Sequence, residues 1–202
     1  MKKIIIYSLF LIFYSAAFSQ TKEEALNAET ITWFGIDFSQ ARFVDDLAFP
    51  SGYELRDKYF KGWNRLIISE PEKYDIPKYF HCIEIKTDLG DVYRRNEDVN
   101  VSDIIVEIPE GDNYKIQEGE IQKIIKDYKA DLEGYGLVFI AESFDKPRVE
   151  GCIWVTYFHI PTKKVVFTRK LVGKPVGFGI RNYWAGAIAD IMKQAGEEKS
   201  SW

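Results

Sequence analysis

Hydrophobic and polar positions follow regular patterns along most of the chain, and these patterns predict its helices and strands. The residues of ITWFGIDFS (31–39) alternate as in a strand and are apolar on both sides, as in the interior of a sheet. After Ser51, apolar residues recur at helical spacing as far as Ser69, and Pro71 cannot continue the helix. Ser51 and Glu54 form the S-x-x-E pattern of a capping box, which marks the start of this helix.

The middle of the chain gives weaker signals. Short apolar runs at 82–86 and 103–108 predict two short strands. The charged stretch between them, DLGDVYRRNEDVN, predicts a solvated loop or a hairpin edge. Arg94 and Arg95 lie in this stretch, where they are either exposed or hold an acidic partner.

The last part of the chain is the most regular. The run IQEGEIQKIIKDYKADL places its isoleucines on one face of a helix. Three strand-like runs and a final amphipathic run follow it. The patterns predict a helix at 116–132, strands at 136–144, 149–160 and 164–172, and a helix at 181–194.

This order of elements predicts the fold class. Helices interrupt the early strands, and a meander of three strands closes the chain. We therefore expect an α+β (mixed α/β) fold in one domain, residues 20–202. Its sheet would be mixed and mostly antiparallel, with about 4–6 strands and about three helices packed on it.

The N-terminus predicts export. Lys2 and Lys3 precede the apolar run 4–13, and the small residues Ala17 and Ser19 stand before a cleavage point. This pattern is typical of a signal peptide at residues 1–19, and the apolar run is short for a membrane span. An uncleaved anchor is the alternative. We expect a periplasmic or secreted protein with no membrane span in its mature chain.

Charge and composition narrow the class of partner. Removal of residues 1–19 takes away two lysines and no acid, which leaves 25 basic and 31 acidic residues and a net charge of −6. Such a chain gains little from neutralising phosphates, so we do not expect nucleic acid as a partner. Hydrophobic residues make up 46% of the full chain, which indicates an ordered core.

The two cysteines lie in strand-like runs. Cys82 and Cys152 either form one disulfide between strands or are buried as small apolar residues. His81 and His159 are the two histidines of the chain. Residues so scattered do not match a zinc site or a Cys–His nucleophile, and we expect neither a metal nor a cofactor.

The segment VGFGIRNYWAG joins the last strand to the last helix. Gly177 and Gly179 stand where the G-x-G-x-x-G fingerprint begins, but Asn182 replaces its third glycine. A helix N-terminus can bind an anion, which Arg181 and Asn182 would help to hold. Alternatively, the glycines only make the turn, Asn182 caps the helix, and Arg181 pairs with an acid such as Asp37.

Two phrases carry a resemblance to known families. WFGIDFS and GFGIRNYW resemble a family of uncharacterised secreted bacterial proteins, which implies no activity. The layout of the chain from its second helix onward also resembles the periplasmic domains of curli-secretion channels and of penicillin-binding-protein activators. In those domains the first strand ends near an Asp-Phe pair, as it does here at Asp37 and Phe38.

Three functions follow from these observations. The first is a non-catalytic exported module that binds an envelope protein or a surface polymer. The second is a protein that binds a small ligand or an anion through Gly177, Gly179, Arg181 and Asn182. The third is an unrecognised hydrolase that uses Asp37, Ser39 or His159. The lack of catalytic patterns favours the first and leans against an enzyme.

Overall fold

The structure is a computed structural model that describes residues 21–107 and 113–202, so the predicted signal peptide lies outside it. Its strands are β1 (Thr30–Asp37), β2 (Arg42–Val44), β3 (Glu84–Thr87), β4 (Ile105–Val106), β5 (Tyr135–Asp145), β6 (Glu150–His159) and β7 (Lys164–Gly173). Its α-helices are α1 (Lys22–Leu26), α2 (Gly52–Glu54), α3 (Lys61–Ser69), α4 (Ile76–Tyr79), α5 (Gly90–Glu97), α7 (Glu118–Lys126) and α8 (Gly179–Glu198). The described residues also contain three 3₁₀ segments, η1 (Asp46–Ala48), η3 (Val101–Asp103) and η4 (Lys199–Ser201), and one π-helical segment, η2 (Leu55–Phe60).

Strand β5 is the centre of a seven-stranded sheet. On one side it pairs with β1 along its first half and with β2 along its second half. Beyond them, β3 pairs with β1 and β4 pairs with β2. On its other side β5 pairs with β6, and β6 pairs with β7.

The sheet corrects our prediction of a mostly antiparallel sheet of fewer strands. The pairings of β1 with β3 and β5, and of β2 with β4 and β5, are all parallel. Only the closing meander of β5, β6 and β7 is antiparallel. The physical reason is that helices separate the early strands, and a connection through a helix returns the chain in the same direction.

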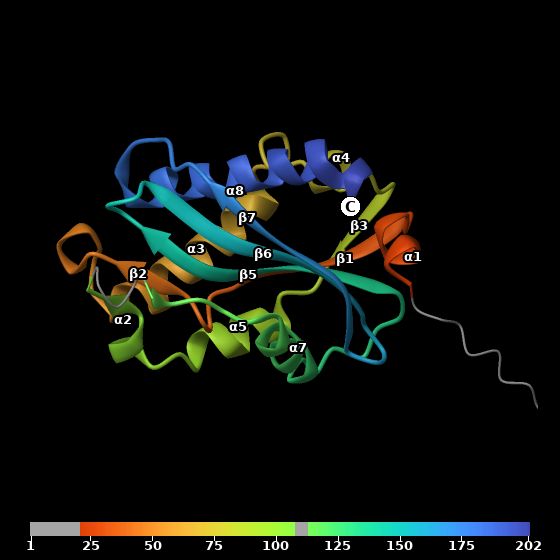
Figure 1. Ribbon diagram of the computed structural model, residues 1–202, viewed down its shortest axis with the longest axis horizontal. Helices are drawn as coiled ribbons and strands as arrows, with labels where there is room; N and C mark the ends of the chain where they lie inside the picture. Colours follow the sequence, from red (N-terminus) through yellow and green to blue (C-terminus); the bar gives the residue numbers. More distant parts are fainter. Residues whose placement is uncertain (1–20, 108–112) are drawn as a thin grey trace, which may run out of the picture.

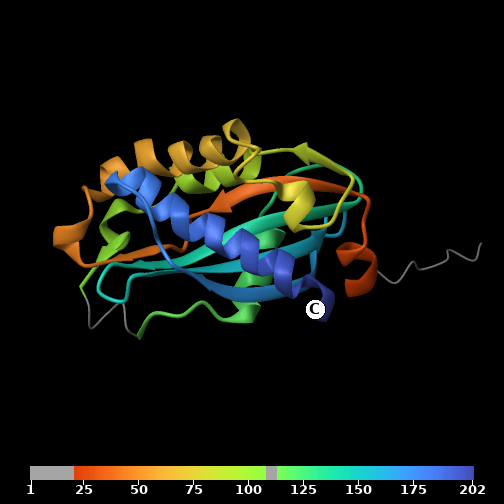
Figure 2. The same cartoon turned by 90° about the horizontal axis from the view of Figure 1, so that it is seen from above.

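Helices cover both faces of the sheet, which gives three layers (Figures 1 and 2). Helices α3, α4 and α8 lie on one face, and α5 and α7 lie on the other (Figure 1). The sheet is therefore buried on both sides, and each face has its own apolar core. In β5, Leu137 and Phe139 face the first core, whereas Val138 and Ile140 face the second. Our prediction of three helices is therefore wrong as well.

The helix predicted after Ser51 is present and ends at Ser69 as expected. The Ser51 hydroxyl accepts a hydrogen bond from the Glu54 amide at 3.2 Å, which confirms the N-cap. The helix is continuous through α2, η2 and α3, but its middle part, η2, is a π-helix. The strands and the final helix predicted for the last part of the chain are also confirmed, with shifts of a few residues at their ends.

Helix α5 corrects the prediction of a loop for the charged stretch after residue 87. Its buried side chains are Asp91, Val92 and Asn96, so its inner face is mostly polar. A helix of this kind lacks the apolar stripe by which helices are predicted. It is held instead by hydrogen bonds to distant segments, which are described below.

Helix α8 lies unusually close to the sheet. A Cβ atom on Gly173 of β7 would lie 2.1 Å from the carbonyl oxygen of Ala187 in α8. A Cβ on Gly186 would likewise lie 2.2 Å from the carbonyl oxygen of Val176. Both positions need glycine because backbone meets backbone there, and they hold the first half of α8 against the end of β7 and the segment that follows it.

Candidate functional site

The two polar residues predicted at the end of the first strand lie together. Asp37 is the last residue of β1 and is fully buried, and its carboxylate faces α5 and the segment after α7. One of its oxygens accepts from the Ser39 amide at 2.8 Å. This bond tightens the turn that separates β1 from β2, so Asp37 and Ser39 belong to one corner of the sheet.

Arg95 of α5 is the partner of Asp37. Its Nε donates to the carboxylate at 2.8 Å, and its second terminal nitrogen donates to the Ser39 hydroxyl at 2.7 Å. The hydroxyl of Tyr128 also donates to Asp37, at 3.1 Å. The pairing of Asp37 with Arg181, one of our alternatives, is therefore not present.

A second layer of charges surrounds this ion pair. Asp127 accepts from Arg95 at 2.7 Å and from Arg94 at 3.2 Å. Asp91, which is also near Arg94, accepts from the backbone amides of Lys129 and Ala130 at 2.7 and 2.9 Å. These bonds join α5 to the segment that follows α7.

The pKa values follow from this arrangement. Burial acts to lower the pKa of Arg95, but attraction to Asp37 and the hydrogen bonds to Asp37 and Asp127 together leave that pKa above its ordinary value. Burial likewise opposes ionisation of Asp127, yet hydrogen bonds from Arg95 and Arg94 hold its pKa below the ordinary value. Burial raises the pKa of Tyr128 well above the ordinary value. Arg95 is therefore a cation, Asp127 an anion and Tyr128 neutral at neutral pH.

The cluster has little capacity for catalysis. The Ser39 hydroxyl receives a hydrogen bond from a guanidinium, which cannot take up its proton as a general base would. His159, the third residue of our hydrolase hypothesis, pairs with Thr162 in the β6–β7 turn at 2.9 Å. The cavity beside Ser39 and Arg95 is small, with a volume of about 270 Å³, and polar. The cluster serves to hold the β1–β2 corner against α5.

The predicted corner before the last helix lies elsewhere. Arg181 and Asn182 are exposed in the first turn of α8, on the face of the sheet opposite to α5. Gly177 and Gly179 both have positive φ, at 136° and 73°, so they make the turn as glycines can. The helix begins after Phe178 without a side-chain cap, so Asn182 does not cap it. The structure thus keeps Asp37 and Ser39 apart from Arg181 and Asn182.

The cysteines and histidines do not form a site either. Cys82 and Cys152 are free thiols in the structure, so the predicted disulfide alternative is not formed. Burial raises the pKa of both thiols, which makes them poor nucleophiles. In the described part of the chain, no three histidine, cysteine or acidic residues are grouped as ligands of a metal ion.

Exposed apolar side chains mark a different surface, which sequence analysis missed. Phe178 is 95% exposed, Val176 is 72% exposed, and Leu47 is 93% exposed. The segments that carry them lie at the same end of the molecule, because Phe49 stacks on Trp184 with ring centroids 5.4 Å apart. We call these three residues the loop end.

Contacts between neighbouring elements hold the backbone beside the loop end in place. The ammonium of Lys146 lies 4.0 Å from the centre of the Tyr183 ring, which ties the β5–β6 turn to α8. The indole nitrogen of Trp63 donates to the carbonyl of Arg181 at 2.9 Å, which ties α3 to the same turn of α8. The exposed side chains therefore project from loops whose backbones are held in place.

The chain matches none of the family models against which it was compared, and no curated protein sequence matches it. Within the described residues, no helix is both long and apolar enough to cross a lipid bilayer. Any function therefore has to be argued from the geometry above.

Proposed function

We propose that the protein is an exported, non-catalytic binding module that holds a protein of the cell envelope at its loop end. The observation that carries this proposal is the exposure of Phe178 and Leu47, two large apolar side chains on neighbouring loops. Single exposed apolar residues are common, but several together at one end of a domain mark an interaction surface.

The shape of the loop end favours a partner with an apolar hollow. Phe178 and Leu47 project almost completely, so they would be buried only if a partner surrounds them. Aromatic and aliphatic side chains that enter such hollows supply most of the binding energy in protein interfaces. Because their loops are anchored through Trp184 and Tyr183, little order has to be gained on binding.

The other two hypotheses have less support. An anion at the turn would meet Arg181 and Asn182, but both side chains are exposed and do not enclose a ligand. A hydrolase would need a base beside Ser39, and its neighbour is the guanidinium of Arg95. The resemblance to exported periplasmic domains agrees with the proposed location and stays a prediction.

The proposal is tested by photo-crosslinking. A benzophenone amino acid is placed at Phe178 or Leu47 of the mature protein, and at Ile83 as the control. Ile83 is 77% exposed and precedes β3, near the opposite end of the sheet (Figure 1). After irradiation in an envelope extract, we expect one protein adduct from the two loop-end positions and none from Ile83.

A matched substitution makes this test quantitative. Phe178→Ala removes the ring from an exposed site without adding a capping group to α8, so the thermal stability should change little, whereas the Leu47 adduct should fall about tenfold. Ile83→Ala should leave that adduct unchanged. Equal labelling from Ile83, or a Leu47 adduct that survives Phe178→Ala, contradicts the proposal. Labelling of a glycan alone would assign the loop end to a surface polymer instead.

A further inference from the structure

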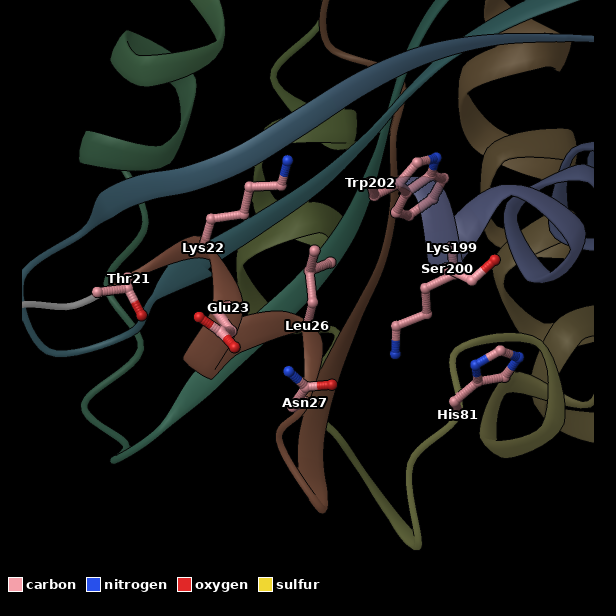
Figure 3. A pocket seen from close by; sticks show the side chains of 9 residues that line it. All are labelled: Thr21, Lys22, Glu23, Leu26, Asn27, His81, Lys199, Ser200 and Trp202. Atoms are coloured by element: carbon pink, nitrogen blue, oxygen red, sulfur yellow. The ribbon is translucent and has the colours of Figure 1, made fainter.

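A second surface lies at the other end of α8. An open cavity of about 720 Å³ is lined by α1, by His81 before β3, and by η4 with Trp202 (Figure 3). Its walls include Leu26 of α1, Asn27 directly after α1, and Lys199 of η4. This volume lies within the range of about 300–1,000 Å³ that is typical of small-molecule sites.

Lys199 is the unusual residue of this cavity. It is only 7% exposed, yet its ammonium points into the space between Asn27 and His81 (Figure 3). One of its three N–H groups donates to the carbonyl of Phe80. Within residues 21–107 and 113–202, the ammonium has neither an ion pair nor a second hydrogen bond.

A buried cation without an anion is costly, because burial favours the neutral amine over the charged ammonium. Burial lowers the pKa of Lys199 below its ordinary value, and its proximity to the Cys82 thiol offsets this only in part. Nearby acids do not compensate the charge: Glu23 is the one carboxylate side chain among the cavity residues, and it lies on the exposed rim. Lys22 and His81 lie on the same rim, so the surroundings are not acidic overall.

The rest of the wall suits an apolar group. Leu26 is buried, and in Figure 3 it lies near the indole of Trp202 on one side of the cavity. That indole is held in place by Phe167, whose ring centroid is 4.9 Å away. The ammonium of Lys22 lies 5.0 Å from the centre of the Phe167 ring, which draws it away from the cavity centre.

We propose that this cavity binds a small organic acid with a flat apolar body. Its carboxylate accepts hydrogen bonds from the two remaining N–H groups of Lys199, and its apolar body lies against Leu26 and Trp202. A carboxylate would supply the missing counter-charge and form charge-assisted hydrogen bonds, which are stronger than neutral ones. The site is separate from the loop end, because α8 runs the length of the sheet between them (Figure 2).

The test compares two probes that differ by one charge. Naphthalene-1-acetate carries a carboxylate, and naphthalene-1-acetamide carries a neutral amide on the same ring. Isothermal titration calorimetry with the mature protein, residues 20–202, should give a dissociation constant about tenfold lower for the acetate. Equal affinity for the two probes, or no heat from either at millimolar concentration, overturns the proposal.

Two variants and one control locate the site. Lys199→Met keeps the apolar stem and should weaken acetate binding about tenfold, to the level of the amide. Lys123→Met removes an exposed lysine of α7 and should change nothing. Asn27→Asp adds a negative charge on the exposed wall, where folding is not affected, and should weaken the acetate about threefold but not the amide. Unchanged acetate binding in both Lys199→Met and Asn27→Asp would place the probe elsewhere.

Discussion

Helices α5 and α7 cover the same face of the sheet, but they bury opposite kinds of side chain. Helix α7 turns Ile121, Ile124 and Ile125 inward. Helix α5 turns Asp91 and Asn96 inward and gives Arg95 to a buried carboxylate. The difference shows that one helix can pack on a sheet through hydrogen-bonded polar groups, while the helix beside it packs through the burial of apolar side chains.

The polar interface of α5 depends on particular hydrogen-bond partners, whereas the apolar interface of α7 depends mainly on the burial of apolar side chains. The amide side chain of Asn96 accepts from the Phe38 N–H at 2.6 Å and donates to the Ile36 carbonyl at 3.0 Å. It therefore satisfies two backbone groups of the sheet at the point where β1 loses its strand partners. An apolar side chain there would leave the Phe38 N–H without this acceptor, which is costly for a buried group. The Ile36 carbonyl would keep only its second bond, which comes from the Asn64 side chain at 3.0 Å.

The largest expected effect comes from breaking the ion pair on the α5 side. Arg95→Met leaves Asp37 buried without its counter-charge, and we expect the free energy of unfolding to fall by about 3 kcal/mol. Urea denaturation measures this change. The double variant Asp37→Asn, Arg95→Met should recover part of the loss, because both charges of the pair are then gone and the amide can still bond to Ser39 and Tyr128. A single variant as stable as the wild type would show that the pair does not hold α5.

A smaller effect is expected on the α7 side. Ile125 is fully buried, and Ile125→Val removes one methyl group from an apolar core. Such a change costs about 1 kcal/mol by urea denaturation. Lys126→Ala, at the exposed neighbouring position, should stay within about 0.5 kcal/mol of the wild type. The comparison fails if Ile125→Val costs more than Arg95→Met.

The smallest effect concerns pH. The pKa of Asp127 is lower in the folded protein than in the unfolded chain, so its ionised form is favoured by folding. Its contribution is present above the unfolded pKa, near 3.8, and is lost as the pH falls through the folded pKa. Asp127→Asn should therefore be slightly less stable than the wild type at pH 6, and this difference should shrink towards pH 3. Because Asp127 is partly exposed, a large difference at pH 6 would contradict this assignment.

The same contrast explains what the sequence could predict. The isoleucines of α7 and the alternating residues of the meander have periods that a single chain reveals. The polar residues Asp91, Arg95 and Asn96 of α5 also have helical spacing, but these residue types are equally common in solvated loops. The helical spacing of polar residues that can bond to the end of a strand is the sequence signal that could have identified α5.

The candidate sites were predictable only in part. Asp37 and Ser39 stand out at the end of the first strand, but their partner Arg95 lies more than fifty residues further along the chain. No sequence pattern near Asp37 and Ser39 points to Arg95. The loop end and the Lys199 cavity were missed because exposure is a property of the folded chain. Phe178 and Lys199 differ from other phenylalanines and lysines only in what surrounds them.

The backbone of α8 meets β7 at Gly173 and meets the segment after β7 at Gly186, and these two contacts fix the first half of the helix on the molecule. A helix of 20 residues extends about 30 Å from end to end. The helix thus acts as a rigid spacer between Phe178 at its start and Lys199 just past its end. The protein partner and the small acid that we propose for these two ends would therefore not compete for the same surface.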